Sequence, residues 1–167
     1  PTVWPMSEPV APVPEDRDWT HVIAEGCTEC GFVPFDPEAA PRRIRAIVPR
    51  WREVLARSTA SDRPAPAVWS PLESACHVRD VCRIMCHRIE LMVETDGARF
   101  ANWDQDATAL EDRYWAQDPT AVADELAVAA EKVEGVSLGF VPEELVPESP
   151  LPMLGHIEDR LSRERFL

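Results

Sequence analysis

The residues best suited to metal or thiol chemistry are the four histidines and five cysteines of this 167-residue chain. Imidazole nitrogens and thiolate sulfurs are the ligands that zinc, nickel, copper and iron take readily from proteins. Two groupings stand out by position. His77 lies near the start of a long apolar stretch, and Cys27 and Cys30 are separated by two residues and followed by glycine. The first is placed to contribute one ligand between helices, and the second to present two thiols from one loop.

The Cys27–Cys30 pair permits three interpretations. Two thiolates of such a loop can share one zinc ion, although a structural zinc site needs four ligands and the only nearby addition is His21. The pair can also cycle between thiol and disulfide, although redox motifs of this kind usually open a helix that follows a strand. Both residues can also pack as small hydrophobic side chains. Packing, metal binding and thiol chemistry therefore stay open for this pair.

His77 has two interpretations of its own. Bundles of helices build metal sites from inward-facing side chains, which makes a histidine near a helix start a candidate ligand. Taken alone, a histidine on a mixed face is more often a hydrogen-bonded core residue. The remaining cysteines, Cys76, Cys82 and Cys86, follow the same helical pattern and are expected to pack as reduced, buried side chains. Cys82 and Cys86 stand one helical turn apart, a spacing that could also hold metal, but their apolar neighbours favour packing.

The long elements that must position these residues are helices. One is predicted to open with Asp36 as N-cap and Pro37 in the first helical position, and to run to Leu55 with an interruption at Pro49. The next is predicted from Ser70, where a capping box with Glu73 begins, to about Thr95. Their apolar side chains recur at steps of three and four, as one buried helix face requires.

A long crossover is predicted after the second of these helices, with a short helix at about 107–115 and aromatic anchors that pin the segment to the bundle. A third long helix is predicted from Asp118 and Pro119 to just before Gly135. A last, short and charged helix is expected at about 153–165. No strand pattern is present, so the predicted class is all-α.

Composition sets limits on domains and partners. Residues 1–17 are expected to form a proline-rich extended segment, and residues 18–167 one helical domain of ordinary size. The net charge of −13 disfavours nucleic acid and anionic membranes as partners. Neither a spanning helix nor a signal peptide is readable from the sequence, which favours a cytoplasmic protein.

Several stretches in this order resemble actinobacterial members of the DinB-like superfamily, which includes mycothiol-dependent transferases and isomerases. They are "DWTHVIAEGCTECGF", "WSPLESACHVRDVCRIMCHRIELM", "FANWDQDATALEDRYWAQDP" and "AVADELAVAAEKV", which together cover about residues 18 to 133. The resemblance implies a four-helix bundle of DinB-like type, with a long crossover between its second and third helices, and a homodimer.

The resemblance also implies a divalent metal, zinc or nickel, held by three histidines. His77 matches the first of these ligands. In place of the pair on the last helix this chain has only His156, with Asp159 close behind, so His77, His156 and Asp159 form the candidate metal site. Such a metal would lower the pKa of a bound thiol such as mycothiol, so that its thiolate attacks an electrophile.

Two functions of different classes follow from this resemblance. One is a metal-dependent thiol transferase or isomerase, with mycothiol as co-substrate. The other is a non-catalytic DinB-like binding or interaction protein with a degenerate metal site, which the altered chain end favours. A third hypothesis, a zinc or redox protein centred on Cys27 and Cys30, rests on the cysteine pair alone.

Overall fold

The computed structural model describes residues 21–36 and 39–138, and within these ranges the named elements of secondary structure are all helical. The helices are α1 (Val22–Glu25), α2 (Ala40–Leu55), α3 (Pro71–Glu94), α4 (Gln105–Glu111) and α5 (Pro119–Leu138), with a 3-10 turn, η2 (Tyr114–Ala116). In these ranges the only β-type pairing is an isolated bridge between Ala65 and Val68. The predicted all-α class is therefore confirmed.

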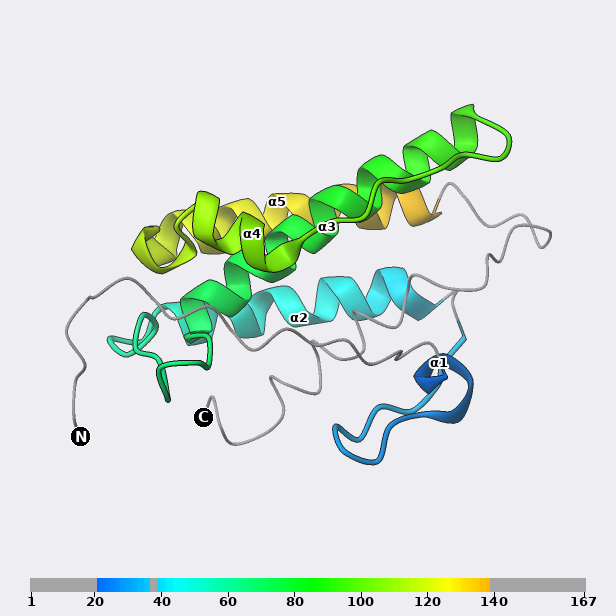
Figure 1. Ribbon diagram of the computed structural model, residues 1–167. Coiled ribbons are helices and arrows are strands. Elements are labelled where there is room, and N and C mark those ends of the chain that lie inside the picture. The colour runs from blue at the N-terminus through cyan, green and yellow to red at the C-terminus, as the bar shows by residue number, and fades with distance from the viewer. Residues whose placement is uncertain (1–20, 37–38, 139–167) are drawn as a thin grey trace.

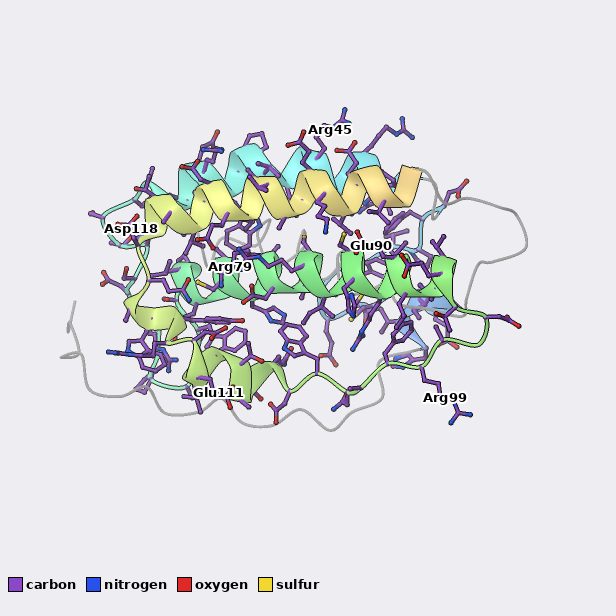
Figure 2. All side chains as sticks on the ribbon, turned by 90° about the horizontal axis from the view of Figure 1, so that it is seen from above. Arg45, Arg79, Glu90, Arg99, Glu111 and Asp118 are labelled. Carbon is purple, nitrogen blue, oxygen red and sulfur yellow. The ribbon has the colours of Figure 1, made fainter. Side chains whose placement is uncertain are left out.

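The three long helices form a bundle. Helix α5 packs along both α3 and α2, as Figure 1 shows. Helix α3 lies between α5 on one side and the crossover segment with α4 on the other (Figure 2). The proline-rich segment 1–17 and the helix expected at about 153–165 fall outside the described residues.

Helix α3 begins where its sequence predicts. The Ser70 hydroxyl accepts a hydrogen bond from the Glu73 backbone N–H at 3.2 Å, and the Glu73 carboxylate accepts one from the Ser70 N–H at 2.9 Å. These two bonds satisfy donors that the first turn of a helix leaves without partners. Glu73 is also bound by Arg63, whose Nε lies 2.8 Å from Oε2, so the helix start is tied to the preceding connector. The helix ends at Glu94 with Thr95 as its C-cap, which agrees with the predicted end at about Thr95.

The start of helix α2 differs from the prediction. Its N-cap is Ala39, not Asp36, and the proline in its first turn is Pro41, not Pro37. A proline at the second helical position loses no intrahelical bond, because the first N–H groups of a helix have no partner within it. Asp36 instead accepts the Ala39 N–H through its backbone carbonyl at 2.8 Å, in a turn before the helix. The helix continues past Pro49 to Leu55.

The crossover between α3 and α5 contains two short helical pieces instead of the single one predicted. Asp104 caps α4 by accepting hydrogen bonds from the N–H groups of Asp106 and Ala107. Arg113 then adopts a left-handed conformation, with φ of 50°, which ends the helical path before η2.

Helix α5 starts as predicted and ends later. The Asp118 carboxylate accepts the Ala121 N–H at 2.8 Å, which caps the helix. The helix then continues through Gly135 to Leu138, since a single glycine lowers helix propensity by only about 1 kcal/mol and packing overrides it. Its predicted apolar stripe is confirmed as buried: Val122, Leu126, Ala129, Ala130 and Val133.

The main core lies where α3 meets α2, α5 and the crossover. Fully buried members include Ile44 from α2, Leu72 from α3, Leu126 from α5 and Tyr114 from η2. A second, much smaller cluster belongs to α1 and the loop after it. Among the described residues, no helix is long and apolar enough to cross a membrane.

Candidate functional site

His77 is partly buried and packs against two tryptophan rings. Its imidazole lies parallel to the Trp103 indole, with ring centroids 5.4 Å apart and planes 6° apart. On another side Trp69 contacts it at 5.3 Å, with planes tilted by 53°. The His77 Nδ1 atom is buried. These contacts place the predicted ligand inside a stack of side chains between α3 and the crossover.

Both tryptophans are held by the elements that carry them. Trp69 directly precedes the Ser70 cap of α3, and its ring also meets Tyr114 edge-on at 6.4 Å. Trp103 comes from the crossover just before α4, and its Nε1–H donates to the Thr108 hydroxyl at 2.8 Å. The prediction that crossover aromatics anchor this segment is therefore confirmed for Trp103 and Tyr114, which pack on the main core.

The described residues do not supply the set of ligands that a metal at His77 would need. Within 21–36 and 39–138, no three His, Cys, Asp or Glu side chains come together as a metal-binding group. The nearest carboxylate along α3, Asp80, is occupied by other partners. His156 and Asp159, the other members of the predicted site, lie outside the described residues.

One turn beyond His77, Arg79 and Asp80 form a buried ion pair. Arg79 Nε lies 2.9 Å from Asp80 Oδ1, and its Nη2 lies 3.0 Å from Oδ2, so both carboxylate oxygens are engaged. The third guanidinium nitrogen bonds Gln117 Oε1 at 2.7 Å and Glu125 Oε2 at 2.9 Å. The Arg79 side chain is only 5% exposed, and Figure 2 places it where α3 faces α5.

The other partners of Asp80 extend the buried ion pair into a polar network that reaches the surface at Arg83 and Glu125, whose side chains are 48% and 46% exposed. The Tyr114 hydroxyl donates to Asp80 Oδ2 at 2.6 Å. Arg83 Nη1 lies 3.1 Å from Asp80 Oδ1, and its Nη2 lies 3.0 Å from Glu125 Oε2. The network therefore joins α3, η2 and α5 through side chains whose buried charges are paired, as burial requires.

Sequence reasoning missed this network. One feature of the sequence could have indicated the network, because Arg79 and Asp80 are adjacent within the apolar stretch of α3. Charged residues inside such a stretch are expected to be paired when they are buried. Their partners, Tyr114, Gln117 and Glu125, come from another helix and a turn, and spacing along the chain does not reveal them.

The network fixes the charge of its members. Burial acts to raise the pKa of Asp80, but hydrogen bonds from Arg79 and Tyr114, with the charges of Arg79 and Arg83, hold it below its ordinary value. Burial and the hydrogen bond to Asp80 raise the pKa of Tyr114. The site therefore holds an ionised carboxylate and a neutral phenol near neutral pH.

This predicts a specific acid response. A carboxyl whose pKa is lowered on folding stabilises the fold fully above its unfolded pKa, about 4, and this contribution is lost as pH falls through the lower folded value. The wild type should therefore lose unfolding free energy more steeply below about pH 4 than Asp80→Asn, which has no charge to lose. Urea unfolding at pH values from 6 to 3 measures both slopes, and parallel curves would contradict the assigned ionisation.

The cysteines of α3 are packing residues, as predicted. Cys76, Cys82 and Cys86 are each at most 1% exposed and belong to the main core. Burial raises the pKa of Cys76 and of Cys82 to about 12, so both are protonated thiols at neutral pH. Burial and the neighbouring Glu90 carboxylate raise the pKa of Cys86 as well.

Cys27 and Cys30 differ from these three. They stand in the turn after α1, where Cys27 is buried and Cys30 is partly exposed, and both are reduced. Hydrogen bonding by the Cys30 backbone, and less strongly by the Cys30 side chain and the Glu29 backbone, lowers the pKa of Cys27 against the opposing effect of burial. The Cys27 thiol in this turn therefore ionises more readily than an ordinary cysteine.

Comparison of the chain with protein-family models, curated proteins and solved structures found no match in any of the three. The packing of α2, α3 and α5 against one another defines the structural class of the described residues, an all-α helical bundle.

Proposed function

We propose that this chain is a DinB-like helical bundle that works as a non-catalytic binding protein, in which the first metal-ligand position of that superfamily has become a packing position. The observation that carries the proposal is the Trp69–His77–Trp103 stack. His77 meets one indole face to face and a second at a tilt, so two faces of aromatic side chains pack on its imidazole. Such contacts stabilise packing and supply no ligand for zinc or nickel.

The polar network next to the stack supports the same proposal. A catalytic centre needs side chains with ligand or proton-transfer capacity directed at a substrate. Asp80, the carboxylate closest to His77 along α3, instead binds Arg79, Arg83 and Tyr114. The polar groups between α3 and α5 are therefore used to hold the helices together.

The partner class that we propose is a protein with a basic surface. The chain carries 30 acidic and 17 basic residues, and the resulting charge repels nucleic acid and anionic lipid. The same charge accelerates and orients association with a cationic protein surface. A homodimer, which the DinB-like resemblance implies, is compatible with such a role.

The test of the packing role is a pair of substitutions at position 77. His77→Ala should lower the free energy of unfolding by about 1–3 kcal/mol, because it removes two aromatic contacts that contribute about 0.5–1.5 kcal/mol each. His77→Phe keeps an aromatic ring and should retain most of the stability. His87→Ala on the same helix is the control, because His87 is exposed and should change stability by less than about 0.5 kcal/mol. Chemical denaturation measures all three variants.

Activity measurements distinguish the competing function. The proposal predicts that neither the wild type nor His77→Phe transfers mycothiol or a related thiol to an electrophile when zinc or nickel is supplied. Metal-dependent thiol transfer by the wild type that is lost in the folded His77→Phe variant would contradict the proposal. That result would support the transferase or isomerase with His77, His156 and Asp159 as ligands.

A further inference from the structure

Helix α2 is strongly basic, although the chain as a whole is acidic. Its 16 residues contain five arginines and a single acidic residue, Glu53, whereas the chain carries 30 acidic and 17 basic residues. Two of the arginines, Arg45 and Arg52, are exposed and pair with acidic side chains of α5. The basic charge on that side of α2 is therefore compensated by the neighbouring helix.

A second line of arginines follows the other side of α2. Arg43 and Arg50 each stand two residues before one of the paired arginines, and so lie about 160° away from it around the helix axis. Arg57 continues the line seven residues further on, in a turn where its N–H donates to the Val54 carbonyl at 3.2 Å. We call Arg43, Arg50 and Arg57 the arginine strip.

The arginine strip is not a fully solvated surface. All three of its side chains are half-buried, and the Nε atom of Arg50 is buried. Charge at such positions is expected to be paired with opposite charge. The strip is therefore a surface that fits an acidic segment of chain.

The lobe of residues 21–36 lies at the start of the arginine strip. The Arg43 guanidinium carbon is 4.0 Å from the centroid of the Phe35 ring. In Figure 1, α1 and its loop lie beside α2, apart from α3 and α5. The lobe has only a small hydrophobic cluster of its own, separate from the main core. Chain that enters the lobe at His21 is therefore tethered on the strip side of α2.

The chain that leads into the lobe is acidic and rich in proline. Residues 8–18 lie outside the described ranges, and the sequence predicts most of them to be extended. They contain one basic residue, Arg17, and four acidic residues: Glu8, Glu15, Asp16 and Asp18. Their charge is thus opposite to that of the arginine strip.

The length of this segment also matches the strip. At the rise of an α-helix, Arg43 and Arg57 are separated by about 21 Å along α2. In the extended form typical of proline-rich chain, Glu8 and Glu15 would be separated by about 22 Å. Acidic residues near both ends of the segment can therefore meet arginines near both ends of the strip.

The other acidic stretch outside the described ranges, residues 139–167, is tethered differently. It follows α5, which packs on the side of α2 that carries Arg45 and Arg52. Chain that leaves α5 must pass around α2 to reach the arginine strip. The tether therefore favours residues 8–18 as the occupant.

We propose that the arginine strip of α2 binds residues 8–18 of the same chain, and that this contact holds the lobe of residues 21–36 against the bundle. Single ion pairs at a surface are weak. Because the segment is joined to the lobe by a short tether, its effective concentration at the strip is in the millimolar range, and several weak pairs are enough. The contact involves no residue of the Trp69–His77–Trp103 stack, so it stands or fails independently of the proposed function.

Release of residues 1–17 by trypsin reports this contact in the full chain. Arg17 is the only basic residue in that range, so cleavage after it liberates one fragment, which mass spectrometry measures at early times. Cleavage is proportional to the fraction of molecules in which the segment is detached. Arg50→Gln/Arg57→Gln should therefore raise the initial rate about three- to tenfold, because it removes two ion pairs. Arg99→Gln is the matched control, because Arg99 is exposed on the crossover side of the bundle, away from α2 (Figure 2), and the rate should not change.

A charge swap distinguishes residues 8–18 from any other acidic partner. Arg57→Glu should accelerate release, and Glu8→Arg added to it should restore protection, because the attraction returns with its signs exchanged. Position 8 is followed by Pro9, so the added basic residue creates no trypsin site. Raising the salt concentration to about 0.5 M should bring the wild-type rate close to that of Arg57→Glu. A synthetic peptide of residues 8–22 corrects for the effect of salt on trypsin itself.

Circular dichroism of each variant confirms that the helices are intact, so that faster release does not report unfolding. A wild-type rate equal to that of the synthetic peptide would overturn the proposal. Acceleration by Arg57→Glu that Glu8→Arg fails to reverse would overturn it as well, because another acidic stretch, such as residues 143–148, would then occupy the strip.

Discussion

Replacement of Asp80 by alanine is expected to lower the free energy of unfolding by about 3–5 kcal/mol, because the substitution leaves a buried guanidinium without its main partner. Arg79 is 5% exposed, and two of its three nitrogens bond the Asp80 carboxylate. The variant also removes the acceptor of the Tyr114 hydroxyl, which donates to the same carboxylate. Urea denaturation followed by circular dichroism measures the loss.

A matched acidic residue on the surface separates burial from charge. Asp124 on α5 pairs with Arg52 at 2.7 Å, but the two side chains are 64% and 51% exposed. Asp124→Ala should therefore cost less than about 1 kcal/mol. Similar losses for Asp80→Ala and Asp124→Ala would show that the network is no more than a surface ion pair, and the account of the α3–α5 packing would be wrong.

Replacement of Tyr114 by alanine is expected to have a comparable effect, a loss of about 3–5 kcal/mol, since it empties the place of a large and fully buried aromatic side chain. Tyr114→Phe keeps the ring and removes only the hydroxyl, so it should cost about 1.5–3 kcal/mol, the range for a hydrogen bond to a charged group. Chemical denaturation of the two variants divides the contribution of Tyr114 into packing and hydrogen bonding.

The control for Tyr114 comes from the same crossover. Phe100 is 40% exposed and contacts Arg88, whose guanidinium carbon lies 5.4 Å from the ring centroid. Phe100→Ala should therefore cost only about 1 kcal/mol. If Tyr114→Ala were no more destabilising than Phe100→Ala, η2 would not anchor the crossover as described.

The elements of the bundle were predictable because their signals are local. Ser70 and Glu73 form a capping box within one turn, and Asp118 stands directly before Pro119, so the starts of α3 and α5 follow from neighbouring residues. The apolar stripes reflect one helix period and are visible in the sequence alone. The start of α2 was mispredicted because two Pro signals compete, at positions 37 and 41, and packing of Ala40 and Pro41 in the core favours the later one.

The arrangement at the candidate site was not predictable because it depends on contacts between distant segments. Trp103 reaches His77 from the crossover, and Glu125 reaches Arg79 from α5. A sequence pattern shows that His77 stands near a helix start, but not which side chains surround it. The Cys27–Cys30 turn is intermediate in this respect. Its spacing is visible in the sequence, whereas the lowered pKa of Cys27 depends on the fold of the loop.

The packing role of His77, as opposed to a metal-ligand role, is tested most directly by the metal content of a variant in which Cys27 and Cys30 are both replaced. In the Cys27→Ala/Cys30→Ala protein, any zinc or nickel that remains after loading and desalting must be held elsewhere. The account predicts that no stoichiometric metal remains and that added zinc or nickel leaves the melting temperature unchanged. Stoichiometric metal in this variant that disappears when His77→Phe is added would contradict it.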